Sequence, residues 1–482
     1  MRSFARFLLP ACLAPWLGSC YFLLDYNDLQ GGAVDNGIGG RPPGCPADCD
    51  DHDPCTTDSC DESSDTPECA HTATEGLALD GFEATLSSEH HVRVSLVGSG
   101  QLFYLAALEV NADTPKVSLY RLASDGEALE AVSPDLGLDG LPVSNVGLAV
   151  EELPLGEVAL HGFLATKGRT AGAPVRVIHV ESKAGKITNN IAGVSYRADN
   201  PSVFPQALAM GDKIVGAWIQ ADGTIAVHNV GAAKTDTFGI ASLPATTLSL
   251  LSTADNQPAV MFTAQAESKA ALGTYVETSG QNRARLPECE MRPGDYLSST
   301  VIGTQIPGVW LANITRAGDD YLASGNGTLV CGNNACTPVA EDCKTATASN
   351  GVREVAGATV RFDGDPPGIV YSVLALPQIA AKADDATIIE AKLSLALGRV
   401  DFSTPGKADS TTIGGDVDKG GLEQIAQNDT TEAAGFAGPD WPAVSILPTR
   451  QVAVAWIQPN AAFDGTELHV QRYKMCLPSR TP

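Results

Sequence analysis

Apolar residues recur in short runs along the chain from about residue 74 to its last residue, 482. Each run is either wholly apolar or alternates apolar with polar positions, as buried or half-buried β-strands do, and few stretches show the 3.6-residue period of a helix. We therefore predict an all-β body over residues 74–482. Seven runs are expected to form one strand each, over residues 102–110, 157–166, 213–220, 258–264, 308–315, 368–376 and 451–458.

Several of these runs are followed by a turn and a second, alternating strand, over residues 116–122, 174–181, 224–230, 387–395 and 466–473. The clearest internal repeat sets Ala217–Gln220 against Ala455–Gln458, both reading AWIQ and both leading through an Asp-Gly turn to the next strand. Paired strands repeated about every 45 to 60 residues suit the blades of a β-propeller. We predict six to eight blades, with seven preferred, each taking its inner strand from one run. Trp218 and Trp456 are expected at equivalent places, packed between adjacent blades. The alternative fold is a set of β-sandwich domains.

The N-terminus reads as a secretory signal over residues 1–19. Arg2 and Arg6 precede an apolar run from Phe7 to Leu17, which is too short to span a bilayer. The run ends in Leu-Gly-Ser-Cys, which resembles the bacterial lipobox, where the cysteine receives diacylglycerol before cleavage. Cys20 is therefore the expected lipidation site, and the alternative is an ordinary signal peptide.

Residues 20–44 are rich in glycine and lack apolar periodicity, so we expect a flexible tether behind the lipid anchor. The lipid would hold the protein on a membrane without spanning it. Tyr21 stands where many inner-membrane lipoproteins have aspartate, so the expected location is the outer membrane or the cell surface.

Export changes how the cysteines are interpreted, because exported proteins usually carry disulfides. Twelve cysteines, less Cys12 in the signal and the lipidated Cys20, leave ten. Five lie within residues 45–73, a cysteine-rich acidic module, and five lie in the body. The ten are Cys45, Cys49, Cys55, Cys60 and Cys69 in the module and Cys289, Cys331, Cys336, Cys343 and Cys476 in the body. With an odd number on each side, either a disulfide joins the two or one cysteine stays free in each.

The stretch "CDDHDPCTTDSCDESSDTPECAHT", residues 49–72, resembles the C-D-D-G-x-P-C-T-x-D-x-C-D modules of myxobacterial surface lipoproteins. The resemblance covers about 24 residues and implies no catalytic activity. It implies that Cys49, Cys55, Cys60 and Cys69 pair among themselves, so that Cys45 bonds to a body cysteine. His52 departs from the family, which has glycine there, so the turn need not adopt the glycine conformation.

Three interpretations of the module remain open. The first is a small knot held by disulfides, since few aliphatic residues are present to form a core. The second is a calcium site with carboxylate ligands, although the usual calcium loop with its distal glutamate is absent. The third is zinc bound by cysteines with His52 or His71. The candidate calcium ligands are Asp48, Asp50, Asp51, Asp53 and Asp58.

The net charge of −26, from 31 basic and 57 acidic residues, argues against nucleic acid as a partner. No catalytic signature of the common hydrolase, metalloprotease or nucleotide-binding types is present. We therefore expect a non-enzymatic surface protein that binds a protein or glycan ligand through a propeller face, with no cofactor apart from the calcium considered above. The alternative is an exported propeller enzyme, a hydrolase or lyase that acts on glycans with carboxylates gathered only by the fold.

Overall fold

The computed structural model describes the strands named below and the turns that adjoin them, between residues 49 and 477. The longest internal stretches outside this description are 133–142, 167–174, 194–204, 286–296, 414–422 and 429–439. All the regular elements in the described part are β-strands. Accordingly, the described residues contain no helix with the length and apolar character needed to cross a membrane. The chain divides into two compact units, Met1–Ala73 and Thr74–Pro482.

The described part of the first unit is an antiparallel hairpin of β1 (Thr56–Asp61) and β2 (Glu68–Ala73). Its register places Asp58 opposite His71 and Cys60 opposite Cys69. Side chains of directly opposed residues share a face, and positions two apart share it too. All four side chains therefore lie on one face of the hairpin.

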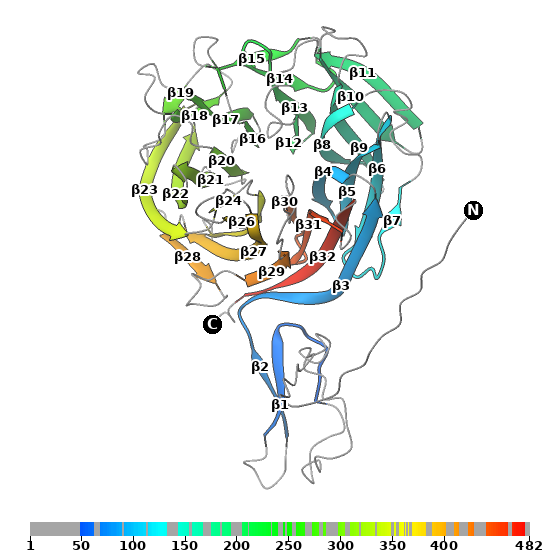
Figure 1. Ribbon diagram of the computed structural model, residues 1–482, viewed down its shortest axis with the longest axis vertical. Coiled ribbons are helices and arrows are strands. Elements are labelled where there is room, and N and C mark those ends of the chain that lie inside the picture. Colours follow the sequence, from blue (N-terminus) through cyan, green and yellow to red (C-terminus); the bar gives the residue numbers. More distant parts are fainter. Residues whose placement is uncertain are drawn as a thin grey trace, which may run out of the picture. The chain divides into compact units, whose positions relative to one another are not determined.

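The second unit contains seven antiparallel sheets of four or more strands among its described residues. We call these sheets blades 1 to 7, in the order of their inner strands. Each inner strand contacts the inner strand of the next blade, and β30 contacts β4, so the ring closes (Figure 1). The inner strands are β4 (His91–Ser99), β8 (Val143–Glu152), β12 (Gln206–Met210), β16 (Ser249–Ser252), β20 (Leu297–Gly303), β24 (Gly351–Val352) with β25 (Ala356–Val360), and β30 (Asp440–Ile446).

Each inner strand hydrogen-bonds to a second strand of the same blade. The second strands are β5 (Leu102–Asn111), β9 (Val158–Thr166), β13 (Lys213–Ile219), β17 (Pro258–Gln265), β21 (Val309–Ala317), β26 (Ile369–Ala381) and β31 (Gln451–Pro459). The third strands are β6 (Thr114–Ala123), β10 (Arg176–Lys183), β14 (Ile225–Asn229), β18 (Leu272–Thr278), β22 (Asp320–Gly332), β27 (Ile388–Asp401) and β32 (Thr466–Cys476).

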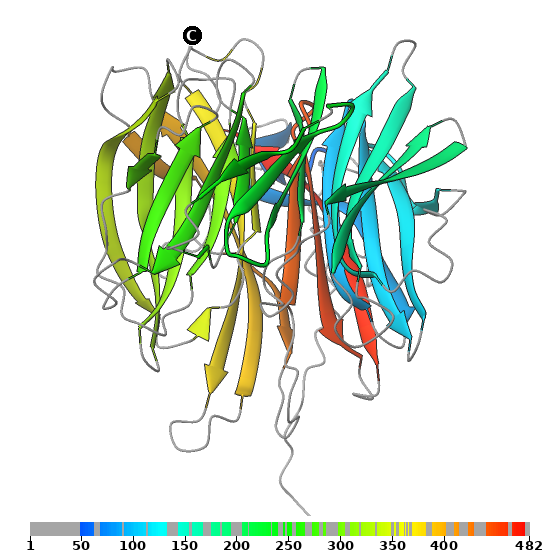
Figure 2. The same cartoon turned by 90° about the horizontal axis from the view of Figure 1, so that it is seen from above.

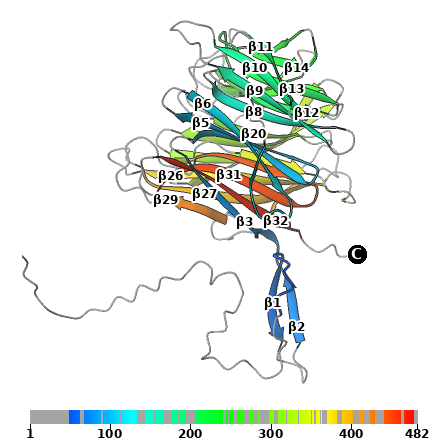
Figure 3. The same cartoon turned by 90° about the vertical axis from the view of Figure 1, so that its right-hand side faces the viewer.

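The outer strands complete the blades, and in Figure 2 the strands of the ring run roughly along one direction. They are β7 (Glu130–Ala131), β11 (Lys186–Gly193), β15 (Asp236–Phe238), β19 (Arg283–Arg285), β23 (Ala335–Ala348), β28 (Asp409–Ile413) with β29 (Glu423–Asn428), and β3 (Gly76–Ser88). The last of these comes from the start of the unit, whereas the other three strands of blade 7 come from its end. Figure 3 shows β3 beside β32, so the two ends of the unit share one sheet and close the ring.

The prediction of an all-β propeller is confirmed, with one correction. The seven apolar runs form the second strands of the blades and not the innermost ones. A second strand has a strand on both edges and a neighbouring blade on both faces, so almost every residue is buried, as in β9, β13 and β31. The innermost strand has one edge at the central axis, and its sequence is correspondingly less apolar.

The hydrophobic core lies between the blades. Separate clusters of buried side chains join blades 1 and 2, 2 and 3, 3 and 4, 6 and 7, and 7 and 1. Trp218, on the second strand of blade 3, packs against blade 2, and Trp456, on the second strand of blade 7, packs against blade 6. Both are almost fully buried. The expectation of equivalent places between blades is confirmed.

Candidate functional site

The cysteine-rich module is held by a disulfide between Cys49 and Cys69. This bond ties the loop before β1 to the start of β2, on the face that also carries Asp58 and His71. Asp51 follows Cys49 by two residues and His71 follows Cys69 by two, so the disulfide brings Asp51 to the same place. Three groups that the sequence separates by up to 20 residues thus converge.

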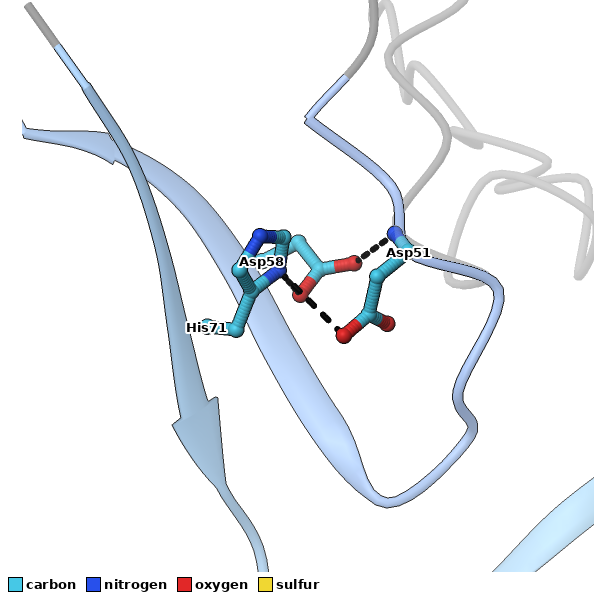
Figure 4. A group of neighbouring side chains, drawn as sticks. All are labelled: Asp51, Asp58 and His71. Carbon is cyan, nitrogen blue, oxygen red and sulfur yellow. Dashed lines mark hydrogen bonds and ion pairs between the residues drawn. The ribbon is translucent and has the colours of Figure 1, made fainter.

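His71 lies at the centre of this cluster (Figure 4). Its Nδ1 atom is 2.7 Å from Asp58 Oδ1 and 3.4 Å from Asp51 Oδ2. The other carboxylate oxygen of Asp58 accepts a hydrogen bond of 2.9 Å from the backbone N–H of Asp51. Hydrogen bonding to His71 lowers the pKa of Asp58, and the same bond raises the pKa of His71. The cluster is therefore an ion pair with a second carboxylate beside it.

Three aspartate side chains, that of Asp51 among them, also cap the backbone of the loop. Asp50 Oδ1 accepts from the N–H of His52 at 2.7 Å, Asp51 Oδ1 from that of Asp53 at 2.8 Å, and Asp53 Oδ1 from that of Cys55 at 2.9 Å. Aspartate commonly bonds to the N–H two residues ahead in such turns. His52 itself has a positive φ of 58°, in the left-handed region that glycine adopts more readily than other residues.

Of the predicted calcium ligands that the structure describes, Asp51 and Asp58 come together, whereas Asp50 and Asp53 lie outside their group. Among the described residues, the groups able to hold a metal ion together are Asp51, Asp58 and His71, whose ligand atoms lie within 4.8 Å of one another. Two carboxylates and one imidazole suit a transition metal better than Ca²⁺, which prefers six to eight oxygen ligands. Asp48 lies outside the described residues, and whether the module binds calcium stays a prediction.

The expected lipidation site Cys20 also lies outside the described residues, as do Cys45 and Cys289. Of the remaining cysteines, Cys55, Cys60 and Cys476 are disulfide-bonded, as Cys49 and Cys69 are. Cys331 and Cys336 stand opposite each other across β22 and β23, with Cys343 further along β23. The predicted bond from Cys45 to the body stays a prediction.

Polar side chains of the inner strands around the axis connect blades 1 and 2. Arg93 on β4 is buried and donates from Nε to Asn145 Oδ1 on β8 at 3.2 Å. Ser99 donates to Glu152 Oε1 at 2.7 Å, again from β4 to β8. The acidic residues on the described inner strands are Glu151, Glu152 and Asp440.

Sequence reasoning missed a second group of titratable side chains, in blade 2. Glu151 on β8, His161 on β9 and His179 on β10 form a hydrogen-bonded chain, and both histidines are almost fully buried. Both histidines lie inside strands that the sequence predicted. The only sequence signal for them is the position each takes in the apolar and polar pattern of its strand. Only the register of β9 against β10 shows that they meet.

The sequence matches no protein-family model and no curated protein. Solved structures with a similar fold include the phage phi92 endosialidase, at 9% identity and a TM-score of 0.42 over 87% of this chain and 72% of that one. An ulvan lyase of polysaccharide lyase family PL25 has 9% identity and a TM-score of 0.41 over 84% and 94%. The β-propeller domain of the Trilobed protease from Pyrococcus furiosus has 8% identity and a TM-score of 0.38 over 82% and 98%. These similarities concern the propeller fold and extend to no site.

Proposed function

We propose that this chain is an exported lipoprotein of the outer membrane or cell surface that binds a protein or glycan ligand through one face of its propeller. In this proposal the lipid on Cys20 anchors the chain, residues 20–44 form the tether, and the disulfide-held module precedes the binding body. The disulfide between Cys49 and Cys69 and the bonded Cys476 support an oxidising, exported environment.

Binding without catalysis is supported by how the inner strands use their polar groups. Arg93 bonds to Asn145, Glu152 accepts from Ser99, and Glu151 contacts a histidine of its own blade. In blades 1 and 2, these groups stabilise the scaffold by satisfying one another. This is the observation that carries the proposal: a closed ring in which the described polar groups on the inner strands of blades 1 and 2 support the scaffold itself.

The anchor is tested by fractionating cells that express the wild type and the Cys20→Ala variant. The wild type is expected in the membrane fraction with an acylated N-terminal Cys20, and the variant is expected to be released. Mass spectrometry that finds the mature N-terminus at another, unmodified residue would contradict the proposed anchor. Cys12→Ala is the control and should leave anchoring unchanged.

Binding and catalysis are separated by incubating the full-length Cys20→Ala protein with arrayed glycans and surface proteins. Retention of a ligand whose mass stays constant over time supports the binding function. Fragments that accumulate with time, and are lost in Glu152→Gln or Asp440→Asn, would instead support the glycan-processing alternative.

A further inference from the structure

A chain of three titratable groups runs across blade 2. His161 Nδ1 lies 3.0 Å from His179 Nε2, and His161 Nε2 lies 3.2 Å from Glu151 Oε2. The two imidazole rings stack with their centroids 5.3 Å apart and their planes 13° from parallel. The histidines are 2% and 4% exposed, whereas the side chain of Glu151 is 35% exposed. One end of the chain is therefore in contact with solvent and the other end is in the protein interior.

The interior end lies where blade 2 packs against blade 3. Alternation along β9 and β10 puts the histidines on the same face as Phe163 and Val177, which are buried with Trp218 of blade 3. The ring of Phe163 is 5.0 Å from that of His179. On the opposing strand β13, a Cβ atom at Gly216 would come within 2.1 Å of Phe163. The two blades are thus in direct contact beside the histidine pair, with no room for added atoms.

The hydrogens in this chain can be counted. The Glu151 carboxylate accepts a hydrogen from His161 Nε2, so in neutral His161 the Nδ1 atom carries a lone pair and accepts from His179 Nε2. The histidine pair can bind one added proton, because only one hydrogen still lies between the two rings. The Glu151 carboxylate then faces the resulting positive charge. Two added protons cannot be held, since both ring nitrogens would then carry a hydrogen at 3.0 Å separation and both rings would be positively charged.

Other charged groups on this face do not stabilise a second added proton at His179, which is the interior end of the chain of titratable groups. The register places Glu181 and Lys183 of β10 and the exposed Lys186 of β11 on the same face, toward Glu151 and His161. On β14 of blade 3, His228 opposes the protonation of His179 by charge repulsion. The facing residues of β12 and β13 are Ala207, Ile214, Gly216 and Trp218, none of which is ionisable. His179 thus has histidines and apolar groups on its interior side.

We propose that the His161–His179 pair is an acid-operated latch on the joint between blades 2 and 3, closed while the two rings share one hydrogen and opened when both rings are protonated. Opening would move charged imidazoles out of the packed face and separate blade 2 from blade 3, without dissolving the other blades.

The burial of His179 also favours opening at low pH. It lowers the pKa of His179 to about 4, with smaller contributions from the charges of His161 and His228. A histidine whose pKa is depressed in the folded state stabilises the fold fully above its unfolded value of about 6.5, and that stabilisation is lost as the pH falls toward 4. The latch therefore opens on acidification.

Hydrogen exchange followed by mass spectrometry tests the latch on the full-length protein. After correction for the intrinsic exchange rate, protection in β9, β10, β13 and β14 should fall at least about tenfold between pH about 7 and about 4.5. Protection in β31 and β32 should fall less than about threefold over the same range. A uniform loss over all blades, or no loss in blades 2 and 3, would overturn the proposal.

Two variants separate the latch from general acid sensitivity. His179→Phe keeps an aromatic ring beside Phe163 and removes the second proton, so the local loss of protection should disappear. The matched control is His469→Phe on β32. His469 is half-buried and stacked on Trp456 in blade 7. Burial lowers its pKa as well, while Thr85 Oγ1 lies 3.2 Å and Glu467 Oε2 3.3 Å from its ring nitrogens. Its substitution should leave the acid response of blades 2 and 3 unchanged.

Glu151→Gln provides a test that does not depend on the folding of a core variant. Without the carboxylate, the first added proton is already unfavourable, so opening should move to higher pH by about one unit. A variant that opens at the wild-type pH, or a His179→Phe variant that folds and still loses protection in blades 2 and 3, would show that the pair is only structural.

Discussion

Asp51 and Asp58 stand seven residues apart in a segment with almost no aliphatic side chains, yet both approach the same histidine. Hydrogen bonds and disulfides stabilise this module, whereas apolar packing stabilises the body. Asp50, Asp51 and Asp53 cap backbone N–H groups of the loop, and Asp58 pairs with His71, so these four side chains have a structural role.

The ion pair makes a prediction that can be measured at one residue. In Asp58→Asn the pKa of His71 should fall toward about 6.5, because the hydrogen bond to Asp58 is the largest cause of its increase. The wild-type pair is complete between the lowered pKa of Asp58 and the raised pKa of His71. Its stabilisation is lost at lower pH as Asp58 is protonated and at higher pH as His71 is deprotonated. NMR titration of the His71 ring checks this. Asp50→Asn is the control, and a His71 pKa that moves equally there would contradict the assignment.

Among the elements, the second strands fix the positions of the other strands, because each has a strand on both edges and a neighbouring blade on both faces. Close contact between blades then depends on small residues at particular positions. Gly216 on β13 lies against the ring of Phe163 on β9, which is fully buried and cannot turn away. A glycine in a strand interior is normally unfavourable, so here the close approach of a ring explains it.

Gly216→Ala should therefore destabilise the protein by about 1 to 3 kcal/mol, the usual cost of overpacking a core. Phe163→Leu alone should cost about 1 kcal/mol, and the double variant should be more stable than the sum of the two single effects by about 1 kcal/mol. Urea unfolding of the four proteins measures the coupling. Additive effects would mean that the added methyl group is accommodated elsewhere.

For the whole molecule, the decisive contact is the one that closes the ring. Arg472 on β32 is buried and donates from Nε to Asp80 Oδ2 on β3 at 2.9 Å. Its other nitrogens bond to the carbonyls of Asp80, Ala123 and Gly126 at 2.7 to 3.1 Å. One guanidinium thus joins the first strand of the unit, the last strand and the end of blade 1. Its carbon also lies 5.6 Å from the ring centre of Phe82.

Arg472→Met should cost about 3 kcal/mol, because it leaves the Asp80 carboxylate and three partly buried carbonyls without their donor. The matched control is Arg121→Met, which removes an exposed ion pair with Glu130 and should cost less than about 1 kcal/mol. Denaturant unfolding compares the two variants. Equal losses would show that Arg472 has no special part in closing the ring.

The sequence by itself determined the fold class, the residue ranges of seven buried strands and the location of Trp218 and Trp456 between blades. These features are readable because burial on both faces leaves a local signal, a continuous apolar run between turn residues. The sequence also predicted disulfides in the module, and Cys49 and Cys69 form one.

Only the tertiary structure decided which side chains meet. Runs that look innermost because they are most apolar proved to be second strands, since burial depends on neighbouring blades that the local pattern does not show. The contacts of Asp58 with His71, His161 with His179 and Arg472 with Asp80 span 13, 18 and 392 residues. Each requires a particular strand register or the closing of the ring. A shift of one residue would turn the same side chains to opposite faces, so composition and periodicity alone could not reveal them.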